Sequence, residues 1–168
     1  MNIFATSECP VESAIVLPNI LMNMMQTESS QLLCTAHYVL DGVQKPYKPT
    51  HVNHPCSIFT RTSKANYMWL YEHFRALCEE YTHRTGKIHK TSELLETLSV
   101  PPANAPDKEL SIDFMCIGDE YKKTLDVHRN YQLYLIAKFK VWAVRTDKRQ
   151  IHVSWTNRTP PKWWIEAN

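Results

Sequence analysis

Residues 47–70 read YKPTHVNHPCSIFTRTSKANYMWL, and this stretch contains the transition on which the predicted fold depends. Pro49 and Pro55, together with the residues before them, disfavour a helix in the first half. Ser63 is a typical N-cap, and the apolar residues after it recur at helical spacing. The stretch therefore predicts an ordered loop over residues 43–62 that leads into a long helix. Such loops often hold anions or carry out chemistry.

Hydrophobic periodicity predicts three long helices, near residues 18–40, 64–85 and 126–144. Pro18 suits the first position of its helix, and Gly86 suits the end of the second. The charged residues of the second helix, Arg84 among them, fall off its apolar stripe and are expected to be solvated. Further sequence features give weaker signals: a helical turn from Pro10, a short helix capped by Thr91, and an alternation over residues 112–116 that fits either a strand or an irregular segment.

Composition limits the fold class. The chain has 168 residues, which suggests one domain with a real core. Only three glycines accompany ten prolines, which argues against a sheet of tight hairpins and against any glycine-rich phosphate loop. We therefore expect a mainly α, compact single-domain helical bundle over residues 1–168, with proline-rich irregular loops and at most a short strand pair. A tail over residues 146–168, rich in proline and tryptophan, should pack on the body.

Charge and cysteine content limit the partners and the compartment. The net charge is +2, so a nucleic-acid surface would have to be a local patch. The five cysteines are odd in number and widely spaced, and no signal peptide is visible, which is typical of a reduced, cytosolic protein. No apolar run is long enough to span a membrane.

Glu28 falls on the apolar stripe of the helix predicted over residues 18–40. A carboxylate in a core is costly unless it is paired, neutral or functional. Two interpretations stay open. Burial would raise its pKa and make it a candidate acid or base, or the carboxylate pairs with a cation such as Arg61 and has a structural role.

Polar and basic side chains are dense in and beside the loop. They could bind a nucleotide or the phosphates of a nucleic acid, and the bland alternative is that they cap the backbone or are simply solvated. A second basic group follows Gly86, about 30 Å away at the other end of a helix of some twenty residues. The candidate binding residues are Lys48, His51, Asn53, Arg61, Ser63, Lys64, Asn66, Tyr67, Lys87, His89 and Lys90.

Metal binding and cysteine chemistry are weaker alternatives. Cys34 and His37 on the first long helix, with His51 and His54 in the loop, would suit tetrahedral zinc. Nothing in the sequence brings the two pairs together, so we expect no metal and no cofactor. Cys56, near the start of a helical turn, is a candidate for a stabilised thiolate.

Several motifs resemble those of small bacteriophage proteins related to the pyrimidine-dimer DNA glycosylase family, the endonuclease-V-like glycosylase/AP lyases. The similarity covers most of the chain. It is carried by Glu28-x-x-Gln31-x-Leu33, His51-Val-Asn-His54-Pro55, Arg61-x-Ser63-x-x-Asn66-Tyr67, Glu79-Glu80-Tyr81 with Arg84-x-Gly86-Lys87, and Trp155-Thr-x-Arg158-x-x-Pro161-x-Trp163.

The resemblance implies a compact helical domain without a metal, active on an N-glycosidic bond of DNA or a nucleotide. Glu28 and His54 are the expected catalytic residues. In the family an α-amine, freed by removal of methionine, attacks the sugar C1′ and forms an imine, and the base is flipped out of the duplex. Here residue 2 is asparagine, whose side chain is too large for ready removal of Met1.

The partner implied by the resemblance is DNA or a nucleotide, with the host cytoplasm as the compartment. The alternative is a non-enzymatic module that uses the same pocket to bind a nucleotide, nucleic acid or a host protein.

Overall fold

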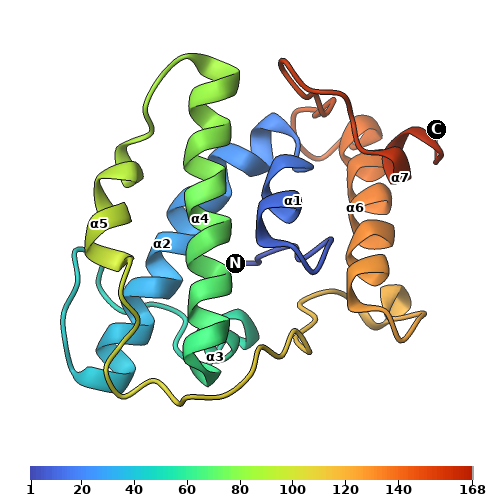
Figure 1. The fold of residues 1–168 in the computed structure, drawn as a ribbon. Coiled ribbons are helices and arrows are strands. Elements are labelled where there is room, and N and C mark those ends of the chain that lie inside the picture. Colours follow the sequence, from blue (N-terminus) through green and yellow to red (C-terminus); the bar gives the residue numbers. More distant parts are fainter. Residues whose placement is uncertain (168) are drawn as a thin grey trace.

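The computed structural model describes residues 1–167, which fold into helices joined by irregular segments (Figure 1). No strand occurs in this range, and the predicted mainly α fold is confirmed. No helix among these residues combines the length and the apolar character needed to cross a bilayer. The α-helices are α1 (Pro10–Ile15), α2 (Asn19–Asp41), α3 (Pro55–Thr62), α4 (Lys64–Thr85), α5 (Leu95–Leu98), α6 (Val127–Val144) and α7 (Lys162–Ile165), with short 3₁₀ helices η1 (Lys90–Leu94) and η2 (Asp119–Tyr121).

The ends of the three long helices, α2, α4 and α6, follow from local signals in the sequence. Ser63 caps α4, because its hydroxyl accepts a hydrogen bond from the Asn66 N–H at 3.0 Å. Gly42 and Gly86 end α2 and α4 with φ of 69° and 70°, the left-handed conformation that glycine adopts at little cost. Asp126 caps α6 by accepting from the N–H groups of its first turn. The three predicted long helices are thus confirmed to within one residue at each end.

Two short elements differ from the prediction, and in both a histidine is the cap. Residues 43–62 were expected to be a loop, but Pro55 begins α3, and His54 Nδ1 accepts a hydrogen bond from the Cys56 N–H at 3.2 Å. The helical turn after Gly86 is capped by His89 rather than by Thr91, because His89 Nδ1 accepts from the Thr91 N–H at 3.2 Å. An imidazole nitrogen here replaces the usual side-chain oxygen.

The first nine residues form an inner layer of the fold. α4 packs against α1, α2 and α3, and the N-terminal segment runs between this group and α6 (Figure 1). Ile3 and Ala5 are fully buried. The Phe4 ring lies 6.3 Å from the ring of Tyr131 and 6.3 Å from that of Tyr134. Much of the packing of α6 on the body is therefore made by the chain's own beginning.

The C-terminal tail packs on the same body. The Trp155 indole donates to the Val16 carbonyl at 2.8 Å, and the Trp155 and Trp164 rings lie against Phe139. Arg158 reaches the buried carboxylate of Glu80. The tail thereby connects α6 to α4 and to the start of α2.

Candidate functional site

Glu28, in the middle of α2, lies beside the beginning of the chain. Its Oε2 accepts a hydrogen bond from the Asn2 backbone N–H at 3.0 Å and lies 3.9 Å from the amino nitrogen of Met1. The Glu28 side chain is 24% exposed, so solvent still reaches it. Arg61 is engaged elsewhere: its Nη1 donates to the Val52 carbonyl at 2.7 Å and to the Ser57 hydroxyl at 3.2 Å. The cation beside Glu28 is therefore an α-amine.

Asn2 fixes the position of that amine. Its Oδ1 accepts from the N–H groups of Ile3 and Phe4 at 2.8 and 3.3 Å, and its Nδ2 donates to the Cys116 carbonyl at 2.8 Å. The turn places Phe4 at φ 59°, a conformation that L residues other than asparagine and aspartate rarely adopt. Backbone held in this way often marks a functional site.

The amine and the carboxylate line one pocket of about 250 Å³. This volume is below the ~300 Å³ at which sites for drug-sized ligands begin, so it suits a single base or sugar. Lys138 supplies a second primary amine, with its Nζ 5.3 Å from the Tyr134 ring centre and 4.8 Å from that of Trp142. The lining residues are Met1, Asn2, Phe4, Leu21, Met24, Met25, Glu28, Cys116, Tyr134, Lys138 and Trp142.

A cluster of sulfur and imidazole groups adjoins this pocket. The Cys56 and Cys116 sulfurs are 3.3 Å apart, and a His54 ring nitrogen lies within 4.8 Å of both. The hydrogen bond from Cys56 lowers the pKa of Cys116, whereas the same contact and burial raise the pKa of Cys56. Cys56 is therefore not the stabilised thiolate that the sequence suggested. Burial lowers the pKa of His54, as does the positive charge of the Met1 amine, while the Glu28 charge raises it. The pKa of His54 therefore depends on both the Met1 amine and the Glu28 carboxylate.

Other residues predicted for the site are used inside the fold. Ser63 and Asn66 are buried, and Asn66 Nδ2 donates to the Ser111 carbonyl at 3.0 Å. Tyr67 is fully buried, and its hydroxyl donates to the Leu98 carbonyl at 2.9 Å. These three side chains hold the segment after α5 against α4, and a bound nucleic acid could not touch Tyr67 without unfolding this region.

The basic and loop residues are distributed over the surface. His51 and Asn53 are exposed just before α3, and the His51 ring centre is 6.4 Å from that of His54. Lys48 is exposed in the loop before α3, and Lys64, the first residue of α4, is half-buried. The second basic group lies beyond the far end of α4, so it does not share the Glu28 pocket. Its members are Lys87, His89 and Lys90.

The four candidate zinc ligands do not converge. His37 Nε2 lies 3.0 Å from the Tyr67 hydroxyl, and Cys34 is fully buried in the core. Within residues 1–167, the group of three potential metal ligands that the fold assembles is His54, Cys56 and Cys116. Only His54 belongs to both sets.

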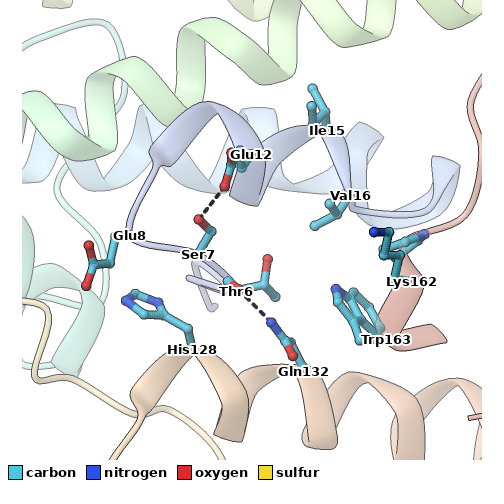
Figure 2. A pocket seen from close by; sticks show the side chains of 11 residues that line it. Thr6, Ser7, Glu8, Glu12, Ile15, Val16, His128, Gln132, Lys162 and Trp163 are labelled. Carbon is cyan, nitrogen blue, oxygen red and sulfur yellow. Dashed lines mark hydrogen bonds between the residues drawn. The ribbon is translucent and has the colours of Figure 1, made fainter. Parts of the chain in front are cut away.

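A larger opening, of about 480 Å³, lies on another face between α1 and the first half of α6 (Figure 2). It shares no lining residue with the Glu28 pocket. Its polar groups bind one another: the Ser7 hydroxyl donates to Glu12 Oε2 at 2.7 Å, and Gln132 Nε2 donates to the Thr6 carbonyl at 3.0 Å. With Glu8 and Glu12 in its lining, it is poorly suited to a phosphate group.

Four participants in the candidate site were absent from the sequence-based prediction: Met1, Asn2, Cys116 and Lys138. Of these, only the α-amine had a signal in the sequence, through the family resemblance. Cys116 had none, since its partners lie 60 and 114 residues away in sequence. Comparisons of the chain with protein-family models, curated proteins and solved structures give no match. Function is therefore inferred from the geometry of this site and from the motifs in the sequence.

Proposed function

We propose that this chain acts on an N-glycosidic bond of DNA or of a nucleotide, as a DNA glycosylase-like phage protein. The observation that carries the proposal is the Met1 amine 3.9 Å from the Glu28 carboxylate, at a pocket of single-base size. An amine and a carboxylate in contact are the two groups that the glycosylase/AP lyase resemblance requires. The cytoplasm of the host cell would be the compartment.

The two groups divide the reaction between them. The amine, in its neutral form, attacks C1′, and the C1′–N bond breaks with its electron pair leaving on the base. The C1′–O4′ bond then breaks as the sugar ring opens and an imine forms, and the amine gives up two protons in all, one of which ends on the departed base and one on O4′. Glu28 stabilises the positive charge that develops on the sugar and on the attacking nitrogen.

His54 is assigned the neighbouring proton-transfer role. Its pKa is lowered chiefly by burial, so the imidazole is neutral at physiological pH. The one acceptor nitrogen of the neutral ring, Nδ1, accepts the Cys56 N–H, so Nε2 carries the proton that His54 can donate to the departing base. His51 and Asn53, exposed on the same loop, would contact the substrate outside the pocket. Arg61 binds the carbonyl of Val52 and so would shape this loop as well as attract phosphate.

The test is to trap the imine. The full chain is incubated with duplex DNA that carries ultraviolet-induced pyrimidine dimers, or with a duplex that carries one abasic site, in the presence of sodium borohydride. Reduction converts an imine into a stable secondary amine, and intact mass followed by peptide mapping identifies the amine. We expect release of base by mass spectrometry and an adduct on the Met1 peptide, unaffected by Lys138→Arg.

Two outcomes would overturn the mechanism. An adduct on Lys138 would replace Met1 as the nucleophile. Binding to DNA or to a nucleotide without base release and without an adduct would favour the alternative function, a non-enzymatic module that binds nucleotides, nucleic acid or a host protein through the same pocket.

A further inference from the structure

We propose that His54, Cys56 and Cys116 form a binding site for a thiophilic divalent metal ion, with Zn²⁺ as the best fit. Three protein ligands leave one of the four tetrahedral positions for water. Cys116 lines the Glu28 pocket, so an ion held here would lie beside it. The inference does not rest on the proposed function, because metal binding is measured without any substrate. An ion bound to His54 would take its ring out of the proton-transfer role, so the two proposals describe different states of the chain.

Two separate parts of the fold supply the ligands. His54 and Cys56 flank Pro55 at the start of α3, and Cys116 comes from the irregular segment before η2. The backbone of Cys116 is fixed on both sides, since its N–H donates to the Tyr131 hydroxyl at 3.1 Å and its carbonyl accepts from Asn2 at 2.8 Å. The site is therefore held in place by neighbouring hydrogen bonds, as metal ligands usually are.

The distances are close to those that zinc requires. Zn–S bonds of ~2.3 Å and Zn–N bonds of ~2.0 Å place two sulfurs about 3.8 Å apart, and a sulfur and a nitrogen about 3.6 Å apart, around a tetrahedral ion. The two sulfurs here are 3.3 Å apart, and all three ligand atoms lie within 4.8 Å of one another. The sulfurs would have to separate by about 0.5 Å, and the sulfur–nitrogen distances to shorten by up to ~1.2 Å. His54 would also release the Cys56 N–H that its Nδ1 accepts, because a neutral imidazole has one acceptor nitrogen. A disulfide would instead require the sulfurs to approach to ~2.05 Å.

The ligand set selects the class of metal. Two thiolates and an imidazole favour Zn²⁺ and other borderline or soft ions, whereas Mg²⁺ and Ca²⁺ require oxygen ligands. Each thiol gives up a proton when it binds the metal, so the affinity should fall as the pH is lowered.

Cobalt provides the direct test, because Co²⁺ bound to thiolates gives a charge-transfer absorption band. The full chain, reduced and freed of metal by a chelator, is titrated with Co²⁺ and then with Zn²⁺ under anaerobic conditions. We expect one equivalent of Co²⁺ with a thiolate band, displacement by Zn²⁺, and a higher melting temperature with Zn²⁺ but not with Mg²⁺.

Variants identify the ligands. Cys116→Ser and His54→Asn should each weaken Zn²⁺ binding by more than the ~10–100-fold typical for loss of an outer-shell partner. Asparagine keeps the N-cap that His54 provides. Cys9→Ser, at an exposed cysteine outside the cluster, is the matched control and should bind as the unaltered chain does.

The unaltered chain decides the question even if the variants fold poorly, because the cobalt spectrum reports thiolate ligands directly. The proposal is overturned if the reduced chain gives no thiolate band, or if Cys116→Ser binds Zn²⁺ as tightly as the Cys9→Ser control. Quantitative oxidation to a Cys56–Cys116 disulfide, with no metal bound by the reduced form, would overturn it as well.

Discussion

Two glutamates hold the ends of this chain in opposite ways. Glu80, in α4, is 2% exposed and binds two arginines, with Oε1 2.6 Å from Arg84 Nε and Oε2 2.9 Å from Arg158 Nη2. Glu28, in α2, is 24% exposed and has one backbone N–H and one amine at 3.9 Å. The first carboxylate is fully paired in the interior, whereas the second still has capacity to interact with a ligand.

The surroundings of Arg84 explain why the Glu80 cluster is tolerated inside the protein. Its remaining donors bind the carbonyls of Ile15 and Leu17 and the side chain of Asn19 at 2.8–3.0 Å. Burial raises the pKa of Glu80, but the hydrogen bonds from Arg158 and Arg84 outweigh it and lower the pKa overall. The buried and fully paired carboxylate of Glu80 has a structural role. The partly exposed carboxylate of Glu28, beside a pocket, is available for chemistry.

The largest effect is expected from Glu80→Gln. This substitution leaves Arg84, 1% exposed at its side chain, without its counter-charge, and should lower the free energy of unfolding by ~3–5 kcal/mol. Urea denaturation measures it, and Glu79→Gln, at a neighbour 62% exposed, should change little. Since the pKa of Glu80 is lowered in the fold, its contribution is present above the ordinary glutamate pKa and is lost as the pH falls below it. Equal stability of the two variants would contradict the structural role.

Glu28→Gln should reverse the pattern. The amide keeps the volume and most hydrogen bonds, so we expect near-normal stability and a loss of ~10²-fold or more in base release. Glu12→Gln, which removes a carboxylate from the other pocket (Figure 2), is the matched control and should retain activity. A loss of ~3–5 kcal/mol in stability would make Glu28 a second structural glutamate, and full stability with full activity would remove it from both roles.

His73 sharpens the contrast, because it is a fully buried titratable side chain. Neither ring nitrogen has a hydrogen bond within residues 1–167, and the ring stacks on Trp69 at 5.6 Å. Burial lowers the pKa of His73 to about 3. In the unfolded chain this histidine takes up a proton below a pKa of ~6.5, whereas in the folded chain it stays neutral. Lowering the pH therefore reduces the free energy of unfolding, by about 2 kcal/mol between pH 7 and pH 5.

Denaturation at pH 7 and pH 5 tests this. His73→Phe should abolish that part of the pH dependence, whereas His51→Gln, at an exposed histidine, should leave it intact. An unchanged slope in His73→Phe would mean that other groups cause the acid sensitivity.

The smallest effect is expected from Arg158→Gln. Its side chain is 40% exposed, so solvent screens its interaction with Glu80, and the loss should be about 1 kcal/mol. Arg149→Gln, at an exposed arginine nearby in sequence, controls for the change in charge. A loss as large as that of Glu80→Gln would mean that the tail, and not Arg84, is the main partner of Glu80.

The sequence predicted what local rules determine and failed where distant segments meet. Caps and stripes located the three long helices, because Ser63, Gly42 and Gly86 act on their own neighbours. The stripe of α2 placed Glu28 on the core face, whereas its side chain is half-buried in the lining of a pocket and 24% exposed. Arg84 was expected to be solvated, yet it is 5% exposed, since two carbonyls at the end of α1 and just after it, and a carboxylate one turn earlier in α4, satisfy its donors.

The candidate site is the less predictable part, because its members come from five separated segments. The partner of Glu28 lies at residues 1 and 2, and the partner of Cys56 lies 60 residues further along the chain. Hydrophobic periodicity along the sequence does not predict contacts between such distant residues. The α3 helix was predicted only as a helical turn near Cys56 within a longer loop, for a different reason: Pro55 was taken to disfavour a helix, although proline at the first helical position is favourable.

The inner position of the first residues has a consequence for synthesis on the ribosome. Asn2 binds the carbonyl of Cys116, 114 residues later, and Thr6 binds Gln132, 126 residues later. At ~5–20 residues per second, a nascent chain needs about 6–25 s to make those partners. During that time Phe4 lacks Tyr131 and Tyr134, and the native contacts open to the first residues are those with segments already made, such as Glu28 in α2.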